Sequence, residues 1–466
     1  MPTQRGQWSS RLGFILAAAG SAVGLGNLWK FPFITWDNQG GAFVYVYLVC
    51  IIAVGLPIMM AEILIGRSTQ KSPVGAMREA FGPAWSWVGG LGVATGFIIL
   101  SYYLVIAGWT LRYFATCLRW SVSGFDPQMA SGDAFGVFAA NGPIQLVLTA
   151  VFIAATMWVV SRGVGEGIEK VARILMPALF GILILLLVSA LSMKGSKEAL
   201  SFILNPDFGR LEPRGILEAL GHSFFTLSLG MGAMITYGSY LRKRDSVVRS
   251  ATIVVLLDTV IAIAATVIMF SVIFTVPEMK EQISKSTAGM LFITLPQLFY
   301  TAVPLGRLLA PLFYVLVGFA ALTSTISLLE VVVSYFIDER KMSRGRATTL
   351  CGSVIFAISV LCGLSLGAWE KISNFSLIYA GSPTAKVGLF SHLDHIASNW
   401  LLPVGGFFIT FGAGWLMTRQ ATEGELVDET TPQWFHYGAW RLFIRYIAPL
   451  AVAAIIIAVI TGKDFS

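Results

Sequence analysis

The chain has 466 residues, of which 56% are hydrophobic and only 12% charged, and its mean hydropathy is +0.75. This composition excludes an ordinary soluble protein and predicts a polytopic membrane protein with room for about eleven to fifteen spans. The net charge of +7 reflects the orientation of loops in a bilayer and indicates no nucleic-acid partner.

Apolar runs long enough to cross a bilayer follow one another along the whole chain. They predict about eleven spans, at residues 11–35, 42–65, 87–116, 143–161, 168–192, 215–240, 249–276, 305–337, 347–366, 399–417 and 440–461. We therefore expect one all-α membrane domain over residues 1–466.

The first run contains an unusual stretch, Gly20-Ser21-Ala22-Val23-Gly24-Leu25-Gly26-Asn27. Each glycine weakens a helix by about 1 kcal/mol relative to alanine, and unwound backbone is tolerated in hydrocarbon only where protein or water surrounds it. We expect this span to be broken near the midplane, with free carbonyls for a cation and free N–H groups for a carboxylate. A continuous helix with small residues for close packing is the alternative.

The distribution of lysine and arginine predicts the orientation of the chain. With the N-terminus inside, 19 of the 32 basic residues lie on the cytoplasmic side and 11 on the outer side, while Lys30 and Arg112 fall within spans. Basic residues favour the cytoplasmic side of a membrane. We expect a cytoplasmic N-terminus and, after an odd number of spans, a C-terminus outside.

A second interruption lies in the sixth run, at Ser228-Leu229-Gly230-Met231-Gly232. Spans one and six enter the membrane from opposite sides, so we expect the two breaks to meet near the midplane. Corresponding breaks in two halves point to an inverted-repeat transporter. The repeats would cover about residues 11–192 and 215–417, five spans each, with the helix at 440–461 peripheral.

Polar side chains inside spans mark a candidate site. Asp258 lies in an apolar run, where an unpartnered carboxylate costs at least about 2.5–3.5 kcal/mol. Thr323-Ser324-Thr325 place three hydroxyls in another span, where hydrogen bonds back to the helix are the alternative role. Oxygen ligands without a His or Cys cluster suit a hard monovalent cation rather than a transition metal.

Long ordered motifs over nearly the whole chain resemble the neurotransmitter:sodium symporters, in particular the bacterial, LeuT-type carriers of hydrophobic amino acids. The matching motifs are Arg5-x-x-Trp8-x-x-Arg11-Leu-Gly-Phe, Gly20-Ser-Ala-Val-Gly-Leu-Gly-Asn27-Leu-Trp-Lys-Phe-Pro32, Gly40-Gly-Ala-Phe43, Phe224-Phe-Thr-Leu-Ser-Leu-Gly230, Tyr237-Gly-Ser-Tyr240, Ala320-Ala-Leu-Thr-Ser324 and Ser398-Asn-Trp-Leu-Leu-Pro-Val-Gly405. The resemblance implies a LeuT-type fold of two five-span inverted repeats.

The resemblance also implies a substrate site and two sodium sites between the breaks. Substrate contacts would come from Ser21, Ala22, Leu25, Gly26, Ile99, Tyr103, Phe225, Thr226, Ser228, Met231, Ser324 and Leu328. The first sodium site would use Ala22, Asn27, Thr226, Asp258 and the substrate carboxylate, and the second Gly20, Val23, Ala320, Thr323 and Ser324. Sodium would complete its shell only with substrate bound, which couples the two bindings.

The function that the resemblance implies is sodium-coupled amino-acid symport by alternating access. Family members that move amines carry an aspartate at the position of Gly24, so the substrate here should bring its own carboxylate. Met231 adapts to differently shaped side chains, and we expect neutral hydrophobic L-amino acids, aliphatic and aromatic. A proton-coupled permease, favoured by His222, and a non-transporting sensor are the alternatives.

Departures from the family pattern predict independence of chloride. Asp258 replaces an amide common in the family, and Ala262 stands where chloride-dependent members have serine. We expect Asp258 both to ligate sodium and to supply the fixed negative charge.

The resemblance implies gates at both ends of the substrate site. Lys30 and Asp394 would form the outer pair, and the inner gate would comprise Arg5, Trp8, Ser239, Tyr240 and Asp338. Gly167 and Pro177 in span five would form a hinge, with ordinary proline kinking as the alternative. We expect Glu62 to brace the break of span one by accepting from its N–H groups.

We expect neither an enzyme nor an organic cofactor, because no catalytic constellation or nucleotide-binding loop is visible. The four cysteines fall in apolar runs without metal or disulfide spacing. Sodium is the expected cofactor, the amino acid and the lipid bilayer are the expected partners, and the expected location is a prokaryotic cell (inner) membrane. The sequence leaves the oligomeric state open.

Overall fold

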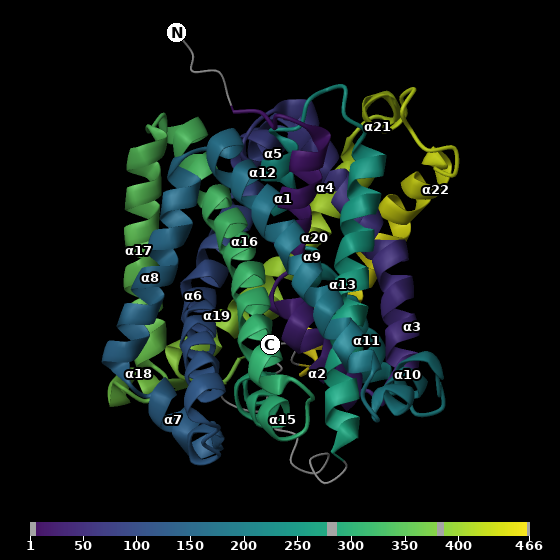
Figure 1. Cartoon of the computed structure of the whole chain (residues 1–466). Helices are drawn as coiled ribbons and strands as arrows, with labels where there is room; N and C mark the ends of the chain where they lie inside the picture. The colour runs from purple at the N-terminus through teal and green to yellow at the C-terminus, as the bar shows by residue number, and fades with distance from the viewer. Residues whose placement is uncertain (1–5, 277–286, 380–385, 464–466) are drawn as a thin grey trace.

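The computed structural model describes residues 6–276, 287–379 and 386–463, and nearly all of its regular structure is helical (Figure 1). The first half comprises α1 (Arg11–Ala22), η1 (Gly26–Lys30), α2 (Phe31–Asp37), α3 (Gly41–Cys50), η2 (Ile51–Gly55), α4 (Leu56–Thr69), α5 (Pro73–Phe81), η3 (Pro83–Trp85), α6 (Ser86–Ser123), η4 (Gln128–Ala130), α7 (Gly132–Ala139), α8 (Gly142–Ser161), η5 (Val164–Glu169), α9 (Lys170–Leu191) and α10 (Ser196–Leu204). The second half comprises α11 (Pro213–Thr226), α12 (Ala233–Gly238), α13 (Val247–Thr275), α14 (Thr287–Gly289), η7 (Met290–Thr294), α15 (Leu295–Thr301), α16 (Gly306–Arg340), α17 (Arg344–Leu364), α18 (Glu370–Ser373), β1 (Ser376–Leu377), β2 (Lys386–Val387), α19 (Leu389–His395), η8 (Ile396–Leu401), α20 (Leu402–Phe411), η9 (Gly412–Leu416), α21 (Arg419–Leu426), α22 (Tyr437–Leu442), η10 (Phe443–Ile447) and α23 (Ala448–Ile460). β1 and β2 pair antiparallel.

The described residues contain 9 helices long and apolar enough to cross a membrane, and a bent pair, Arg11–Ala22 with Gly26–Asp37, makes a tenth candidate span. The sixth expected span is present as α11 and α12, of 14 and 6 residues, which are separated by residues 227–232. Neither is long enough to span a bilayer alone. The helical class and both interrupted spans are therefore confirmed.

The interruption of the first span follows from its backbone. α1 ends at Ala22, Val23 adopts an extended conformation with φ −72° and ψ 97°, and the chain resumes at an angle of 49° to α1. The interruption of the sixth span contains three residues with positive φ, Ser228, Gly230 and Gly232. A Cβ built on Gly230 would lie 2.5 Å from the carbonyl oxygen of Leu402, so both conformation and space require glycine there.

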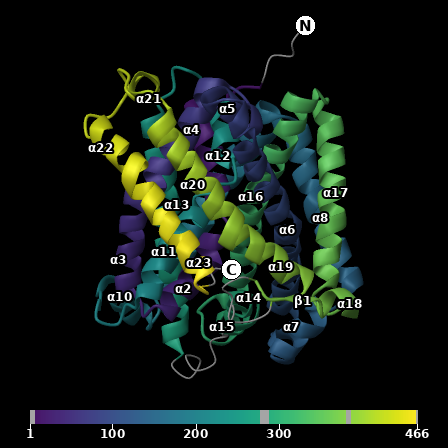
Figure 2. The ribbon, with the colours of Figure 1, turned by 180° about the vertical axis from the view of Figure 1, so that it is seen from behind.

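Helices that carry the site are packed closely against their neighbours. A Cβ built on Gly66 in α4 would lie only 2.0 Å from the carbonyl oxygen of Ile235 in α12. Small residues let membrane helices approach in this way. The short α12 is thereby held against α4. On the face seen in Figure 2, α20 and α23 lie side by side.

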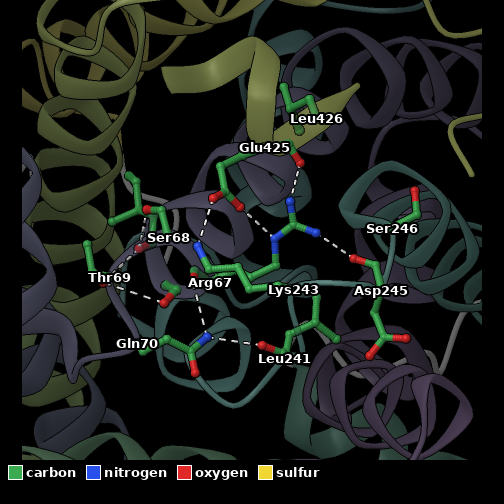
Figure 3. Close-up of polar contacts among 12 residues, drawn as sticks. Arg67, Ser68, Thr69, Gln70, Leu241, Lys243, Asp245, Ser246, Glu425 and Leu426 are labelled. Atoms are coloured by element: carbon green, nitrogen blue, oxygen red, sulfur yellow. Dashed lines mark hydrogen bonds and ion pairs between the residues drawn. The ribbon is translucent and has the colours of Figure 1, made fainter. Parts of the chain in front are cut away.

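The end of the molecule where α1 begins is tied together by Arg67 at the end of α4 (Figure 3). Its Nε donates to Glu425 Oε2 at 2.7 Å, and its other nitrogens donate to the carbonyl oxygens of Asp245 and Glu425. Lys243 Nζ contacts the same carboxylate at 2.9 Å. The Arg67 side chain is only 3% exposed, so α21 is fixed to α4 and to the loop after α12 through a buried charge.

Candidate functional site

The break of the first span leaves backbone N–H groups without helical acceptors, and nearby side chains accept from them. The N–H of Gly24 donates to Asn27 Oδ1 at 3.1 Å, and the N–H of Leu25 donates to the Tyr103 hydroxyl at 3.2 Å. Backbone donors at a helix break also suit an anionic ligand.

The two breaks are bonded to one another. Ser228 Oγ donates to the carbonyl oxygen of Ser21 at 2.8 Å. This contact places the end of α1 against the loop that joins α11 to α12, as the sequence predicts.

Glu62 braces the sixth span rather than the first, so our expectation for this residue is wrong. Its Oε1 accepts from the N–H of Gly230 at 2.7 Å, and its carboxylate also faces the N–H groups of Met234 and Ile235. The reason is that α4 packs against α12, whose first turn offers free N–H groups to a carboxylate.

A small cavity of about 30 Å³ lies between the breaks, and we call it the central cavity. Its lining residues are Ser21, Ala22, Gly24, Leu25, Gly26, Ile99, Tyr103, Phe225, Thr226, Ser228, Met231, Ser324, Ser327 and Leu328. The structure thus brings together all 12 of the substrate contacts expected from sequence and adds Gly24 and Ser327.

Three of the residues expected at the first sodium site form one buried network. Asn27 Nδ2 donates to Asp258 Oδ1 at 2.8 Å, and Thr226 Oγ1 donates to both carboxylate oxygens at 3.1 and 3.2 Å. Asp258 is fully buried, and no basic side chain in the described ranges forms an ion pair with it. Ala22, the fourth expected ligand, lines the central cavity beside this network. An all-oxygen set with a buried, unpaired carboxylate fits a hard cation.

The residues expected at the second sodium site lie on two neighbouring helices. Gly20 on α1 faces Thr323 on α16, since a Cβ on the glycine would lie 3.0 Å from the Thr323 Cβ. Val23 follows α1 at the break, and Ala320 lies on α16 beside Thr323.

The hydroxyls of Thr323 and Ser324 at this second site differ in their hydrogen bonds. Thr323 Oγ1 donates back to the carbonyl oxygens of Phe319 and Ala320 at 3.1 and 3.0 Å, as the alternative role predicts. Ser324 Oγ is buried and has no hydrogen-bond partner in the part of the chain that the structure describes. A donating hydroxyl keeps two lone pairs, so both side chains are able to ligate a cation.

A wider cavity of about 620 Å³ adjoins the central cavity, and Leu25, Gly26, Tyr103 and Phe225 line both. Lys30 and Asp394, the expected outer gate, both line this wide cavity. Lys30 Nζ lies 5.2 Å from the centroid of the Phe225 ring, and Asp394 Oδ1 accepts from Ser398 Oγ at 3.0 Å.

The expected inner gate lies at the opposite end, where α1 begins. Trp8 is fully buried, its Nε1 donates to the carbonyl oxygen of Tyr237 at 2.9 Å, and its N–H donates to that of Tyr240 at 3.1 Å. Ser239 is buried beside them. Asp338 Oδ2 accepts from the N–H of Ser72 at 2.7 Å, and Arg5 lies outside the described residues.

Span five departs from a regular α-helix where a hinge is expected. Gly167 lies in η5, a π-helical segment, and Pro177 lies inside α9. Glu169, at the end of η5, accepts from the N–H of Ser9 and from Arg173, both at 2.7 Å. The irregular start of this span is therefore tied to the residues that precede α1.

Two groups of polar residues at the site are absent from the sequence predictions. Ser327 lines the central cavity one helical turn after Ser324, and that spacing could have identified it.

Glu330 accepts from the Tyr240 hydroxyl at 2.7 Å and from two nitrogens of Arg344 at 2.7 and 2.9 Å. Glu330 is, like Asp258, a carboxylate within an apolar span. That position could have identified it in the sequence as a residue with a buried partner.

Comparisons with known proteins agree with this architecture. The model of the sodium:neurotransmitter symporter family matches residues 5–124 and 135–462. An uncharacterised sodium-dependent transporter of Bacillus subtilis is 34% identical over 460 residues, 98% of each chain, and one of Methanocaldococcus jannaschii is 31% identical over 474 residues, 97% of this chain and 90% of that one. The crystal structure of MhsT in complex with L-phenylalanine is 39% identical, with a TM-score of 0.83 over 97% of this chain and 99% of that chain.

The fold and site define a multi-pass membrane transporter with two interrupted spans, and the LeuT-type fold is confirmed by the likeness to MhsT. The chain belongs to the sodium:neurotransmitter symporter family and is a sodium-coupled symporter.

Proposed function

We propose that this protein moves neutral hydrophobic L-amino acids into a prokaryotic cell together with sodium, by alternating access. The observation that carries the proposal is the central cavity. Residues at the interruptions of both spans line it, together with all the expected substrate contacts. L-Phenylalanine is bound in the structure of the similar protein MhsT, which supports this substrate class.

In this proposal the substrate carboxylate lies against the backbone of Leu25 and Gly26 and the Tyr103 hydroxyl. The ammonium group lies against carbonyl oxygens of Ala22, Phe225 and Ser228. Free N–H groups supply partial positive charge and free carbonyls partial negative charge, so a zwitterion is matched at both ends. Gly24 adds no carboxylate of its own, which favours a substrate that carries one.

Sodium would bind at two places beside the substrate. Asn27, Thr226, Asp258 and the Ala22 carbonyl would hold one ion, and Gly20, Val23, Ala320, Thr323 and Ser324 would hold the other. Two inward sodium ions gain about 2.3 kcal/mol each at 100 mV and about 1.4 kcal/mol each from a tenfold gradient. Their sum supports accumulation of the amino acid by about five orders of magnitude.

Asp258 also supports transport that does not depend on chloride. Its carboxylate is fully buried and would supply a fixed negative charge beside the first ion. Replacement of chloride by gluconate should leave uptake unchanged, whereas strong inhibition by gluconate would contradict this role.

We place the wide cavity on the outer side of the membrane and the buried Trp8 on the cytoplasmic side. The N-terminus would then be inside and the C-terminus outside, in agreement with the distribution of basic residues. The present geometry resembles a carrier whose inner end is closed around Trp8, Ser239, Tyr240 and Asp338. Opening at Gly167 and Pro177 would release the second sodium ion first.

Uptake by the purified protein in proteoliposomes tests the proposal. We expect radiolabelled L-leucine and L-phenylalanine to accumulate under an inward sodium gradient and not when choline replaces sodium. Uptake in choline that follows an inward proton gradient would favour a proton-coupled permease instead. The two ring nitrogens of His222, buried and without partners in the described ranges, are the observation that favours this second candidate.

A further inference from the structure

Two serine hydroxyls from different helices form a bonded pair in the wall of the central cavity. Ser21 lies on α1 and Ser327 on α16, and both line the cavity while remaining buried. Ser21 Oγ donates to Ser327 Oγ at 2.8 Å, and Ser327 Oγ donates to the carbonyl oxygen of Ser324 at 2.8 Å.

The chemistry that this pair offers follows from counting protons. A hydroxyl has one donor proton and two acceptor lone pairs. Both protons are in use, because each points at an oxygen of the protein. Ser21 Oγ accepts no hydrogen bond from the described residues, and Ser327 Oγ accepts one. The pair therefore presents acceptor lone pairs to the cavity and no free proton.

The side chains around this pair are mostly apolar. Ile99, Met231 and Leu328 line the same cavity, and the remaining hydroxyl of the α16 wall, on Ser324, belongs to the second ion site in the proposed function. A substrate group that donates a hydrogen bond would regain at Ser21 the bond that it loses on leaving water. A group that only accepts would find no donor in the pair.

We propose that Ser327, by accepting the hydrogen bond that Ser21 donates, makes the central cavity prefer amino acids whose side chain ends in a hydrogen-bond donor. Tyrosine and tryptophan are the natural members of this class. The inference rests on the proposed function, since it names the substrate class of the same site. Ser327 is a specificity residue here, and Ser21 is the acceptor that it orients.

Equilibrium binding of L-tyrosine and 4-fluoro-L-phenylalanine to the purified protein, at saturating sodium, tests the inference. The two probes are similar in size, and only tyrosine carries a donor at the end of its ring. We expect the wild type to prefer tyrosine, and the double variant S21A/S327A to lose about three- to tenfold of that preference. Its affinity for 4-fluoro-L-phenylalanine should fall less than its affinity for tyrosine, because that probe makes no hydrogen bond to the pair.

Ser334→Ala is the matched control. Ser334 lies on the same helix, is equally buried, and donates to the carbonyl oxygen of Val331 at 2.9 Å, but it does not line the cavity. Its removal should leave the ratio of the two affinities unchanged. The single variants S21A and S327A each leave one hydroxyl oxygen in the wall and should give intermediate ratios, which keeps the test decisive if the double variant does not fold.

An unchanged ratio in the double and single variants would overturn the inference, and so would an equal fall in S334A. A wild type that binds 4-fluoro-L-phenylalanine as tightly as tyrosine would also overturn it while leaving the proposed function intact. Failure of the wild type to bind any of the hydrophobic amino acids would contradict the proposed function itself.

Discussion

The hydroxyl of Ser228 donates a hydrogen bond of 2.8 Å to the carbonyl oxygen of Ser21, so one interrupted helix is bonded directly to the other. In a continuous helix this carbonyl would accept from the N–H of Leu25. That N–H donates instead to the Tyr103 hydroxyl. The second break therefore satisfies part of the first, and the site exists only where the two halves of the chain meet.

Gly24 should tolerate no side chain. A Cβ at this position would lie 2.7 Å from Ser324 Oγ and 3.2 Å from the Tyr103 hydroxyl. We expect Gly24→Ala to weaken amino-acid binding at least tenfold, about 1.4 kcal/mol, because both hydroxyls must move. Gly181→Ala is the control, since a Cβ there meets nothing within 4 Å. Equal binding by the two variants would show that Gly24 does not shape the site.

Removal of the charge on Asp258 should weaken sodium binding. We expect Asp258→Asn to raise the sodium concentration for half-maximal uptake at least tenfold, because the amide keeps the oxygen ligand and loses the charge. A sodium titration of uptake measures this. Asp37→Asn removes a carboxylate from the wide cavity instead and should shift the titration less than about twofold. Matching titrations for the two variants would contradict our assignment of the first ion site.

Glu62 should stabilise the break of the sixth span. Hydrogen bonds to charged groups contribute about 1.5–3 kcal/mol, and we expect Glu62→Ala to lose about this much through its contact with Gly230. Glu62→Gln retains an acceptor oxygen and should lose less. Thermal melting in detergent compares the variants, and an alanine variant that melts with the wild type would show that the contact does not brace the loop.

Arg67 should matter far more for stability than Lys243, although both contact Glu425. The Arg67 side chain is 3% exposed and that of Lys243 is 62% exposed. Loss of one partner from a buried pair costs about 3–5 kcal/mol, and loss of an exposed one about 0–1 kcal/mol. Melting temperatures of Arg67→Ala and Lys243→Ala test this order. A larger effect at Lys243 would mean that α21 is held chiefly by the surface contact.

The sequence predicted both interruptions because glycine density and misplaced polar residues are local signals. The substrate contacts expected around the central cavity came from the family resemblance. The orientation of Glu62 could not be predicted, because it depends on whether α4 packs against the first or the sixth span. Ser327 was missed because a serine in a helix usually bonds to its own backbone, and only the packing of α1 against α16 brings Ser21 to it.

The pairing of Glu330 with Arg344 was missed for a related reason. The two residues lie on consecutive helices, α16 and α17, and the turn at Lys341 brings them together. Their bond to Tyr240 depends further on the position of α12, which lies far away in the sequence. Charges in spans are visible from sequence, whereas their partners are fixed by tertiary packing.

The dependence of substrate affinity on sodium tests the central claim most directly, namely that the two breaks bind an amino acid and sodium together. Equilibrium binding of radiolabelled L-phenylalanine to the purified protein would be measured at increasing sodium concentration, with choline to keep the ionic strength constant. We predict that the dissociation constant falls steeply as sodium rises, because each ligand completes the site of the other. A dissociation constant that is the same in sodium and in choline would contradict the account.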